Sequence, residues 1–321
     1  MTTDESETAM RAVRFHEYGD PTVLRTDEVD RPTPAAGEVR IRVAATSYNP
    51  VDANIRAGFM QGPIPVTLPH TLGSDVAGTV DALGAGVTGL AAGDTVVGFL
   101  GMSTEGASAE YVVAPAEVLA PAPTAIPLAD AAAFPLVGLT AWQALFDHGG
   151  LTAGRRVLVN GAGGAVGGYA VQLAHGAGAH VVATAGPGSR DRVERDGADV
   201  VVDHTTTDVV TAVTEPVDVL LNLAPVDAER CAARVGLVRD GGVVVSTTVW
   251  LPAPADEARG VRAVDVFVRP DAAQLAHLTQ LVDAGALRVD VAERVALDDL
   301  GDLHARAAEG RLPGGKVVVV V

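Results

Sequence analysis

A glycine-rich turn between an apolar strand and a helix is the feature that most constrains what this chain can fold into. The apolar run Arg156–Asn160 leads into Gly161–Gly167 (GAGGAVG), and an Ala-, Val- and Leu-rich segment follows at once. Glycines at such a turn remove the side chains that would keep a diphosphate away from the backbone N–H groups at a helix N-terminus. Such a pattern is weak evidence alone, but its place between a strand and a helix strengthens it. The turn therefore predicts a dinucleotide site.

Apolar strands and helix-length segments alternate on both sides of this turn. The predicted strands are near-continuous apolar runs, as expected of parallel strands that are buried on both faces. Repeated strand–helix–strand units of this kind predict a doubly wound parallel sheet. Besides Arg156–Asn160, the strands are His180–Thr184, Val200–Asp203, Val217–Asn222, Gly242–Thr247 and Arg262–Val268, with helices at Val166–Gly176 and Arg190–Gly197.

The first third of the chain has a different pattern, of short β-prone runs separated by Gly, Pro and Asp turns. This pattern indicates a β-rich domain of the barrel or sandwich kind. The runs are Ala12–Phe15, Val39–Ala45, Asp75–Val80, Thr95–Phe99 and Tyr111–Ala114.

Two changes of pattern, near Pro127 and Pro270, set the expected domain boundaries. An Ala-rich helical segment, Leu128–His148, begins the strand–helix alternation. After Pro270 come two predicted helices, Asp271–Ala284 and Leu297–Glu309, and a last strand, Lys316–Val321. We expect this tail to rejoin the β-rich domain. The expected fold is α/β, with residues 1–127 plus 271–321 in the β-rich domain and 128–270 in the dinucleotide-binding domain.

Charge and cysteine content exclude several classes of protein. The formal net charge of −17 disfavours binding to nucleic acid or to an anionic membrane surface. A single cysteine, Cys231, cannot form an internal disulfide or a cysteine-rich zinc site. The chain has no apolar stretch of about 18 residues and no signal-peptide pattern. We expect a cytoplasmic protein whose residues 1–9 form a disordered extension.

The end of the second strand indicates which nicotinamide cofactor is used. NAD-binding domains place an acidic residue there for the ribose hydroxyls. Here the strand ends at Thr184, and no acid appears until Asp191. Ser189 and Arg190 offer a hydroxyl and a cation, which suit a 2′-phosphate. NADP(H) is therefore favoured over NAD. His204 is either near the adenosine phosphate or an ordinary surface histidine.

Several motifs together resemble those of one family, the zinc-independent medium-chain dehydrogenases/reductases of the quinone oxidoreductase (zeta-crystallin-like) group. The resemblance runs from Met10 to the C-terminus and implies a GroES-like domain split around a Rossmann domain, and a homodimer. Besides the glycine turn, the motifs are Met10–Leu24, Tyr48–Gly58, Leu72–Val80, Gly93–Gly98, Glu110–Val113, Gly138–Leu145, Ala198–His204, Asp240–Val245 and Gly315–Val319.

The resemblance also bears on zinc. Zinc-using relatives bind the catalytic metal through Cys, His and Cys or Asp. Their first cysteine would fall near Asn49 here, and their histidine would fall at Ser74. Because these positions offer no thiolate or imidazole, we expect no catalytic zinc. A metal-free site suits an acceptor that conjugation has already activated, so the expected substrate is a quinone or an α,β-unsaturated carbonyl.

The same resemblance supplies the candidate site residues. Asn49 is expected near the nicotinamide, and Tyr48 either donates a hydrogen bond to the substrate or packs the wall. Asp52 is expected to cap a turn or helix. The family's two tyrosines after the asparagine are replaced by Asn54 and Met60, so Met60, Phe59 and Trp250 are expected to shape an apolar pocket instead. The expected cofactor contacts are Asn49, Thr140, Gly161, Ala162, Gly163, Gly164, Ala165, Val166, Thr184, Ser189, Arg190, His204, Leu223, Ala224, Thr247, Phe267 and Val268.

Two alternatives to a quinone or enone reductase stay open at this point. One is an enoyl reductase of a specialised biosynthetic pathway. The other is a dinucleotide-binding sensor with little catalysis, which the two replaced tyrosines keep possible.

Overall fold

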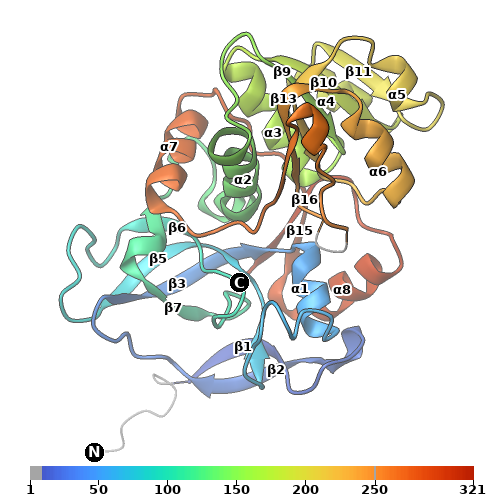
Figure 1. Cartoon of the computed structure of the whole chain (residues 1–321). Helices are drawn as coiled ribbons and strands as arrows, with labels where there is room; N and C mark the ends of the chain where they lie inside the picture. Colours follow the sequence, from blue (N-terminus) through green and yellow to red (C-terminus); the bar gives the residue numbers. More distant parts are fainter. Residues whose placement is uncertain (1–8, 249–250) are drawn as a thin grey trace, which may run out of the picture. The chain divides into compact units, whose positions relative to one another are not determined.

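The computed structural model describes residues 9–248 and 251–321, and within it the chain divides into two compact units (Figure 1). Unit 1 contains Met1–Leu136, Arg269–Gly285 and Val289–Val321, and unit 2 contains Val137–Val268 and Ala286–Arg288. The domain boundaries expected from the sequence stay a prediction. Trp250 and the expected extension lie outside the described residues, except for Ala9, which begins strand β1.

Unit 2 is built on a six-stranded sheet in which every pairing is parallel, as the apolar strands predicted. The order is β11-β10-β9-β12-β13-β14, so β9 has β10 on one side and β12 on the other. The chain crosses over between β11 and β12, and ligands of such sheets bind where the order reverses. The strands are β9 (Arg156–Asn160), β10 (His180–Ala185), β11 (Val200–Asp203), β12 (Val217–Asn222), β13 (Val238–Ser246) and β14 (Arg262–Asp265).

The helical segment at the boundary of the two units departs from expectation. The helix predicted over Leu128–His148 is broken into a 3₁₀ segment (Leu128–Ala133) in unit 1, α2 (Pro135–Trp142) and a π-helical segment (Gln143–His148). Pro135 accounts for the first break, because proline has no N–H with which to continue the helical hydrogen bonds and instead begins α2. The other helices of unit 2 are α3 (Ala165–Gly176), α4 (Arg190–Arg195), α5 (Val209–Ala212) and α6 (Ala228–Val235).

Unit 1 joins the two ends of the chain in one seven-stranded sheet. Its last strand, β16 (Lys316–Val320), pairs antiparallel with β3 (Glu38–Ser47) and parallel with β15 (Val291–Ala296). Figure 1 shows the N-terminal strands of this unit in blue and β15, β16 and α8 in red. The sheet also contains β5 (Asp75–Leu83), β6 (Thr95–Phe99), β7 (Tyr111–Pro115) and β8 (Leu119–Pro121).

The remaining elements of unit 1 form a small second sheet and three helices. The small sheet is β2 (Leu24–Asp30), β1 (Ala9–Phe15) and β4 (His70–Thr71). The helices are α1 (Pro50–Arg56), α7 (Ala272–Asp283) and α8 (Leu300–Ala308). Sequence analysis missed β15, although its residues alternate between half-buried and exposed, as a one-sided strand requires.

No helix within residues 9–248 and 251–321 is long and apolar enough to cross a bilayer. The longest, α3 and α7, have 12 residues each, and a span needs about 20.

Two glycines explain the shape of the turn after β9. Gly161 has φ +94°, a region that side chains with a Cβ rarely adopt. A Cβ on Gly167, in the first turn of α3, would overlap the Gly161 carbonyl oxygen and approach Ala162 Cα to 2.5 Å. The helix therefore starts against the backbone of the turn, and only glycine permits this approach.

Replacing Gly167 should therefore destabilise unit 2. We expect Gly167→Ala to lower the free energy of unfolding by about 1–3 kcal/mol, the usual effect of overpacking. Gly176→Ala is the matched control in the same helix, because a Cβ there meets nothing within 4 Å. Thermal unfolding of both variants tests this. Equal midpoints for the two variants would contradict the packing argument.

Candidate active site and dinucleotide site

A chain of side-chain hydrogen bonds links the strand ends in unit 2 that surround the glycine turn. Gly161 N donates to Thr184 Oγ1 (2.9 Å), and Thr184 Oγ1 donates to Asn160 Oδ1 (3.1 Å). Asn160 Nδ2 donates to Asn222 Oδ1 (2.7 Å), and Asn222 Nδ2 donates to Ser246 Oγ (3.3 Å). All four side chains are buried. The network ties together the carboxyl ends of β10, β9, β12 and β13, and so holds the turn in place.

Sequence analysis found part of this arrangement and missed the rest. It selected Thr184 but not the pairing of Asn160 with Asn222, although each asparagine ends a mainly apolar strand. Leu223 N donates to Asn160 O (2.9 Å), and Thr247 N donates to Asn222 O (3.1 Å). The Ala224 methyl lies 3.1 Å from where a Cβ on Gly161 would be. The structure thus brings the glycine turn together with Thr184, Leu223, Ala224 and Thr247.

The other expected cofactor contacts in unit 2 are more scattered. Thr140 is buried within α2. Phe267 and Val268 follow β14, the outermost strand, and the Phe267 ring is 57% exposed. Their roles toward a cofactor stay predictions.

The loop after β10 holds the residues expected at the 2′-phosphate. Ser189 Oγ donates to Gly186 O (3.3 Å). Arg190 Nη1 pairs with Glu194 Oε1 (2.8 Å), and its Nη2 donates to Val201 O (3.2 Å). Arg192, which sequence analysis did not select, donates from Nη2 to Gly163 O in the glycine turn. Arg190 is therefore held by its own helix, α4, and by the neighbouring strand β11, while Arg192 contacts the glycine turn.

A buried polar cluster lies at the end of β3 in unit 1. Lys316 Nζ donates to Asn49 Oδ1 (2.8 Å) and Tyr48 O (3.1 Å), and it lies 3.5 Å from Asp75 Oδ2. Asp75 Oδ2 also accepts from Ser47 Oγ (2.5 Å) and Asn49 Nδ2 (2.8 Å). Lys316 is 3% exposed and Asp75 is fully buried.

Lys316 is the only lysine in the chain, against 22 arginines. Its ammonium has three N–H donors on one small centre and meets three acceptors here. A planar guanidinium could not place its donors in this way. Burial lowers the Lys316 pKa, and the Asp75 carboxylate opposes that change. The geometry of the site thus accounts for a lysine at this position.

Asn49 also begins α1, through a reciprocal cap with Asp52. Asn49 N donates to Asp52 Oδ2 (2.8 Å), which confirms the capping role expected of Asp52. Asp52 is 3% exposed, and burial raises its pKa to about 7, although the Asn49 N–H opposes the shift. The Asn49 amide is committed to Lys316 and Asp75, so its expected contact with a nicotinamide stays a prediction.

Tyr48 packs against a buried histidine. Its ring meets His304 of α8 edge-on, with centroids 5.1 Å apart. Burial raises the Tyr48 pKa to about 12, so the phenol keeps its proton at neutral pH. Burial lowers the His304 pKa to about 3, so this imidazole stays neutral. Tyr48 can thus donate a hydrogen bond, which leaves open both roles that the sequence allowed.

The expected apolar pocket of Met60, Phe59 and Trp250 is corrected in part. Met60 is 2% exposed and packs in a core cluster with Phe15, Ile55, Ile64 and Leu72. Phe59 is 66% exposed. Met60 therefore belongs to this core cluster.

The donor set in unit 1 does not fit a zinc ion. Asn49 presents an amide oxygen that an ammonium already occupies, and Ser74 is a buried hydroxyl. Nowhere in the described part of the chain do three or more His, Cys, Asp or Glu side chains gather as a metal site requires. Zinc needs thiolate, imidazole or carboxylate ligands in tetrahedral order.

The chain also resembles known protein families and individual proteins. Residues 35–124 match the alcohol dehydrogenase GroES-like domain, and residues 197–319 match the domain described as zinc-binding dehydrogenase. The chain is 33% identical to the chloroplast envelope quinone oxidoreductase homolog of Arabidopsis thaliana, with 97% of this chain and 98% of that one covered. It is 29% identical to the human mitochondrial NAD(P)H oxidoreductase RTN4IP1, with coverage of 100% and 91%.

A solved structure gives the same result. The Escherichia coli quinone oxidoreductase complexed with NADPH matches this chain with a TM-score of 0.85 and 26% identity, covering 97% of this chain and all of that one. These comparisons confirm both the GroES-like and Rossmann fold and the family resemblance that the motifs carried.

Removing one partner of the buried ion pair should be costly. We expect Lys316→Met to lower the free energy of unfolding by about 3–5 kcal/mol, because it leaves the Asp75 carboxylate buried without a cation. The double variant Asp75→Asn/Lys316→Met should lose less than the two single variants added together. Urea unfolding of all three variants checks this, and strictly additive losses would argue against a coupled pair.

Asp52 should make stability fall as pH rises. Its folded pKa of about 7 lies above the ordinary 3.8, so the folded state binds more protons between those values. The contribution of Asp52 is therefore complete below about pH 4 and lost as pH rises through 7. Asp52→Asn keeps an oxygen acceptor for Asn49 N but cannot titrate. From pH 5 to pH 8, urea unfolding should show the variant gaining on wild type by about 2–3 kcal/mol. Parallel profiles would show that Asp52 does not titrate in this range.

Proposed function

Because the chain belongs to the medium-chain dehydrogenase/reductase family, within its quinone oxidoreductase group, we propose that it transfers a hydride from NADPH to a quinone or an α,β-unsaturated carbonyl without a metal ion. The family makes the chain a nicotinamide-dependent oxidoreductase. The acceptor, the preference for NADPH and the independence from metal are the finer parts of the proposal.

One observation carries the metal-free part: the ammonium of Lys316 donates to Asn49 Oδ1, near which the first zinc ligand of zinc-using relatives is expected to fall. Without a Lewis acid, a simple alcohol or ketone is poorly activated. A quinone or enone accepts hydride at carbon and spreads the resulting charge onto oxygen. Such an acceptor needs only orientation and a hydrogen-bond donor near that oxygen.

The residues of unit 2 suit the cofactor. The backbone N–H groups of Gly163, Ala165 and Val166, at the start of α3, would hold the diphosphate. Those of Gly161, Ala162 and Gly164 already donate to acceptors within the protein. NADPH supplies the hydride when it is bound. Thr184, on which Gly161 N is anchored, would keep this backbone in register.

Tyr48 is the proposed donor to the substrate oxygen. Its pKa of about 12 keeps the hydroxyl protonated at neutral pH, so it can stabilise a developing oxyanion without losing its proton. The proton that completes the reduction would come from solvent.

We further propose a cytoplasmic homodimer with no nucleic-acid or membrane partner. The single cysteine supports a reducing compartment, and the charge of −17 disfavours nucleic acid. The two relatives named above are chloroplast and mitochondrial proteins, so fractionation in the source organism tests the compartment. Light scattering on the purified protein tests the dimer.

Steady-state oxidation of NADPH and NADH with a panel of quinones and enones tests the main proposal. We expect turnover with NADPH that survives dialysis against a chelator. Tyr48→Phe should lower kcat about 100-fold, the lower end of the range for loss of an oxyanion donor, and leave KM for NADPH unchanged. Tyr18→Phe is the matched control, since Tyr18 packs beside Phe15 in another cluster.

Two results would count against this function. Loss of turnover on chelation would remove the metal-free mechanism. Tight NADPH binding with no turnover on any acceptor would favour a dinucleotide-binding sensor instead.

A further inference from the structure

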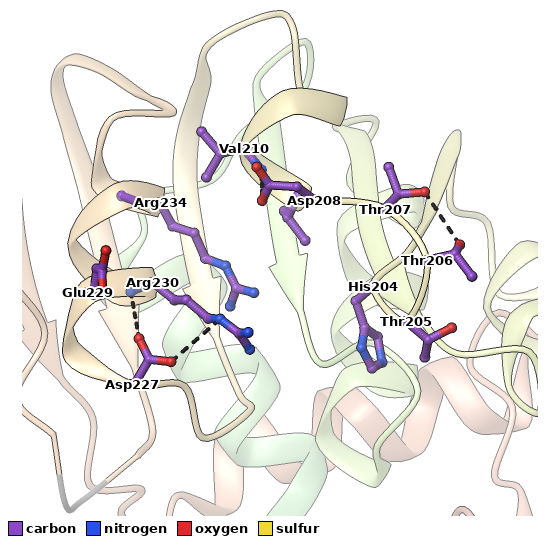
Figure 2. Close-up of a pocket in the computed structure, with 12 residues that line it drawn as sticks. His204, Thr205, Thr206, Thr207, Asp208, Val210, Asp227, Glu229, Arg230 and Arg234 are labelled. Carbon is purple, nitrogen blue, oxygen red and sulfur yellow. Dashed lines mark hydrogen bonds and ion pairs between the residues drawn. The ribbon is translucent and has the colours of Figure 1, made fainter.

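A pocket of about 730 Å³ lies in unit 2, beside the residues expected at the adenosine end of the cofactor. It is lined by the loop after β11, by α5 and by residues along α6 and at its N-cap (Figure 2). The loop contributes His204 and the three threonine hydroxyls that follow it. Helix α6 contributes Arg230 and Arg234.

Arg234 is the unusual member of this pocket. It is only 9% exposed, yet its side chain has no hydrogen bond or ion pair to any residue that the structure describes, and its Nη1 is buried. Figure 2 shows the guanidinium groups of Arg230 and Arg234 extending from α6 into the pocket, on the side facing His204. Burial lowers the Arg234 pKa, and Asp208 and Asp227 only partly offset it. An unpaired buried cation is costly, which indicates that an anion completes its environment.

The other cations nearby already have partners. Arg190 is bound by Glu194 and Val201 O, and Arg192 by Gly163 O. Arg230 is 3.5 Å from Asp227 through Nε. Arg234 is therefore the cation of this region that is left to meet a ligand.

The pocket also lies next to the expected position of the ribose. The end of the second strand is where the adenosine ribose binds in such sheets, and here that end is Ala185–Gly186. His204 N donates to Ala185 O (3.4 Å), and His204 Nε2 lies 3.7 Å from where a Cβ on Gly186 would be. His204 thus lies beside the expected ribose position and also lines the pocket.

The carboxylates of the pocket are occupied by local structure. Asp208 caps α5 by accepting from Val210 N (3.2 Å) and Thr211 Oγ1 (3.0 Å). Asp227 caps α6 by accepting from Arg230 N (2.8 Å). Glu229 also lines the pocket. With two arginines against three acids, the walls carry no general excess of positive charge, so attraction of an anion depends on Arg234 itself.

We propose that this pocket receives the phosphate-bearing adenosine end of NADP(H), and that Arg234, with Arg230 beside it, binds the 2′-phosphate. The inference rests on the proposed function and deepens it, because it assigns the preference for NADPH to α6 rather than to Arg190. A guanidinium can bind a phosphate through two parallel N–H groups, whereas the ribose hydroxyl of NADH offers it no charge.

Calorimetric titration with 2′,5′-ADP and 5′-AMP tests the proposal without turnover. Wild type should bind 2′,5′-ADP more tightly than 5′-AMP. Arg234→Gln should weaken 2′,5′-ADP by about 10-fold or more, as expected for loss of a charge-assisted contact, and leave 5′-AMP within about 2-fold. Arg234→Lys should retain part of the preference, because it keeps the charge but not the two parallel donors. Arg262→Gln, at an exposed position on β14, is the matched control and should change neither.

Thermal unfolding without ligand separates a ligand role from a structural one. Because the Arg234 side chain has no partner among residues 9–248 and 251–321, Arg234→Gln should unfold at the wild-type midpoint or above it. A lower midpoint, or equal weakening of both nucleotides, would make Arg234 a packing residue and overturn the inference. Loss of the preference in Arg190→Gln but not in Arg234→Gln would place the phosphate at the loop after β10 and also overturn it. If wild type binds neither nucleotide, nor NADPH or NADH, the proposed function itself fails.

Discussion

The pairing of β16 with β3 is the interaction on which unit 1 depends. The chain leaves this unit after Leu136 and returns to it only at Arg269, so the sheet is complete only when the last strand meets one of the first. That pairing carries Lys316 to the end of β3, where Tyr48, Asn49 and Asp75 accept its three donors. A buried ammonium is tolerable only with such partners. The closure of the sheet and the chemistry of the candidate active site therefore rest on the same strand.

In unit 2 the corresponding constraint lies at the glycine turn between β9 and α3. The glycines bring the start of α3 against the end of β9, and the hydrogen bonds from Thr184 through Asn160 and Asn222 to Ser246 hold the strand ends rigidly around it. The buried polar side chains satisfy one another and, through Thr184, also fix Gly161 of the turn. A network of this kind suits a binding site that is preformed before a ligand arrives.

Two of the buried cations, Lys316 and Arg234, differ in whether the protein supplies partners for the charge. Lys316 has an acceptor for each of its donors, and its charge stabilises the fold of unit 1. Arg234 has no partner among the described residues and faces a pocket. The protein supplies the acceptors for Lys316, whereas the side chain of Arg234 faces the pocket without one.

Local signals in the sequence were enough for the architecture. The apolar strands, the helices between them, the glycine turn and the missing zinc ligands are properties of short segments, because periodicity, turn chemistry and residue type act over a few positions. The differences between the predicted and observed elements also have local causes. Pro135 breaks a predicted helix, and the alternating pattern of Val291–Ala296 forms a strand that was not predicted.

Only the tertiary structure decided which polar atoms meet. Lys316 and Asn49 are 267 positions apart, and Asn160 and Asn222 are 62 apart. No local pattern reports such contacts, since they depend on strand register and packing. The same holds for Met60, which lies in the core, and for Arg234. Whether a buried group is satisfied is a property of its surroundings, and these exist only once the chain has folded.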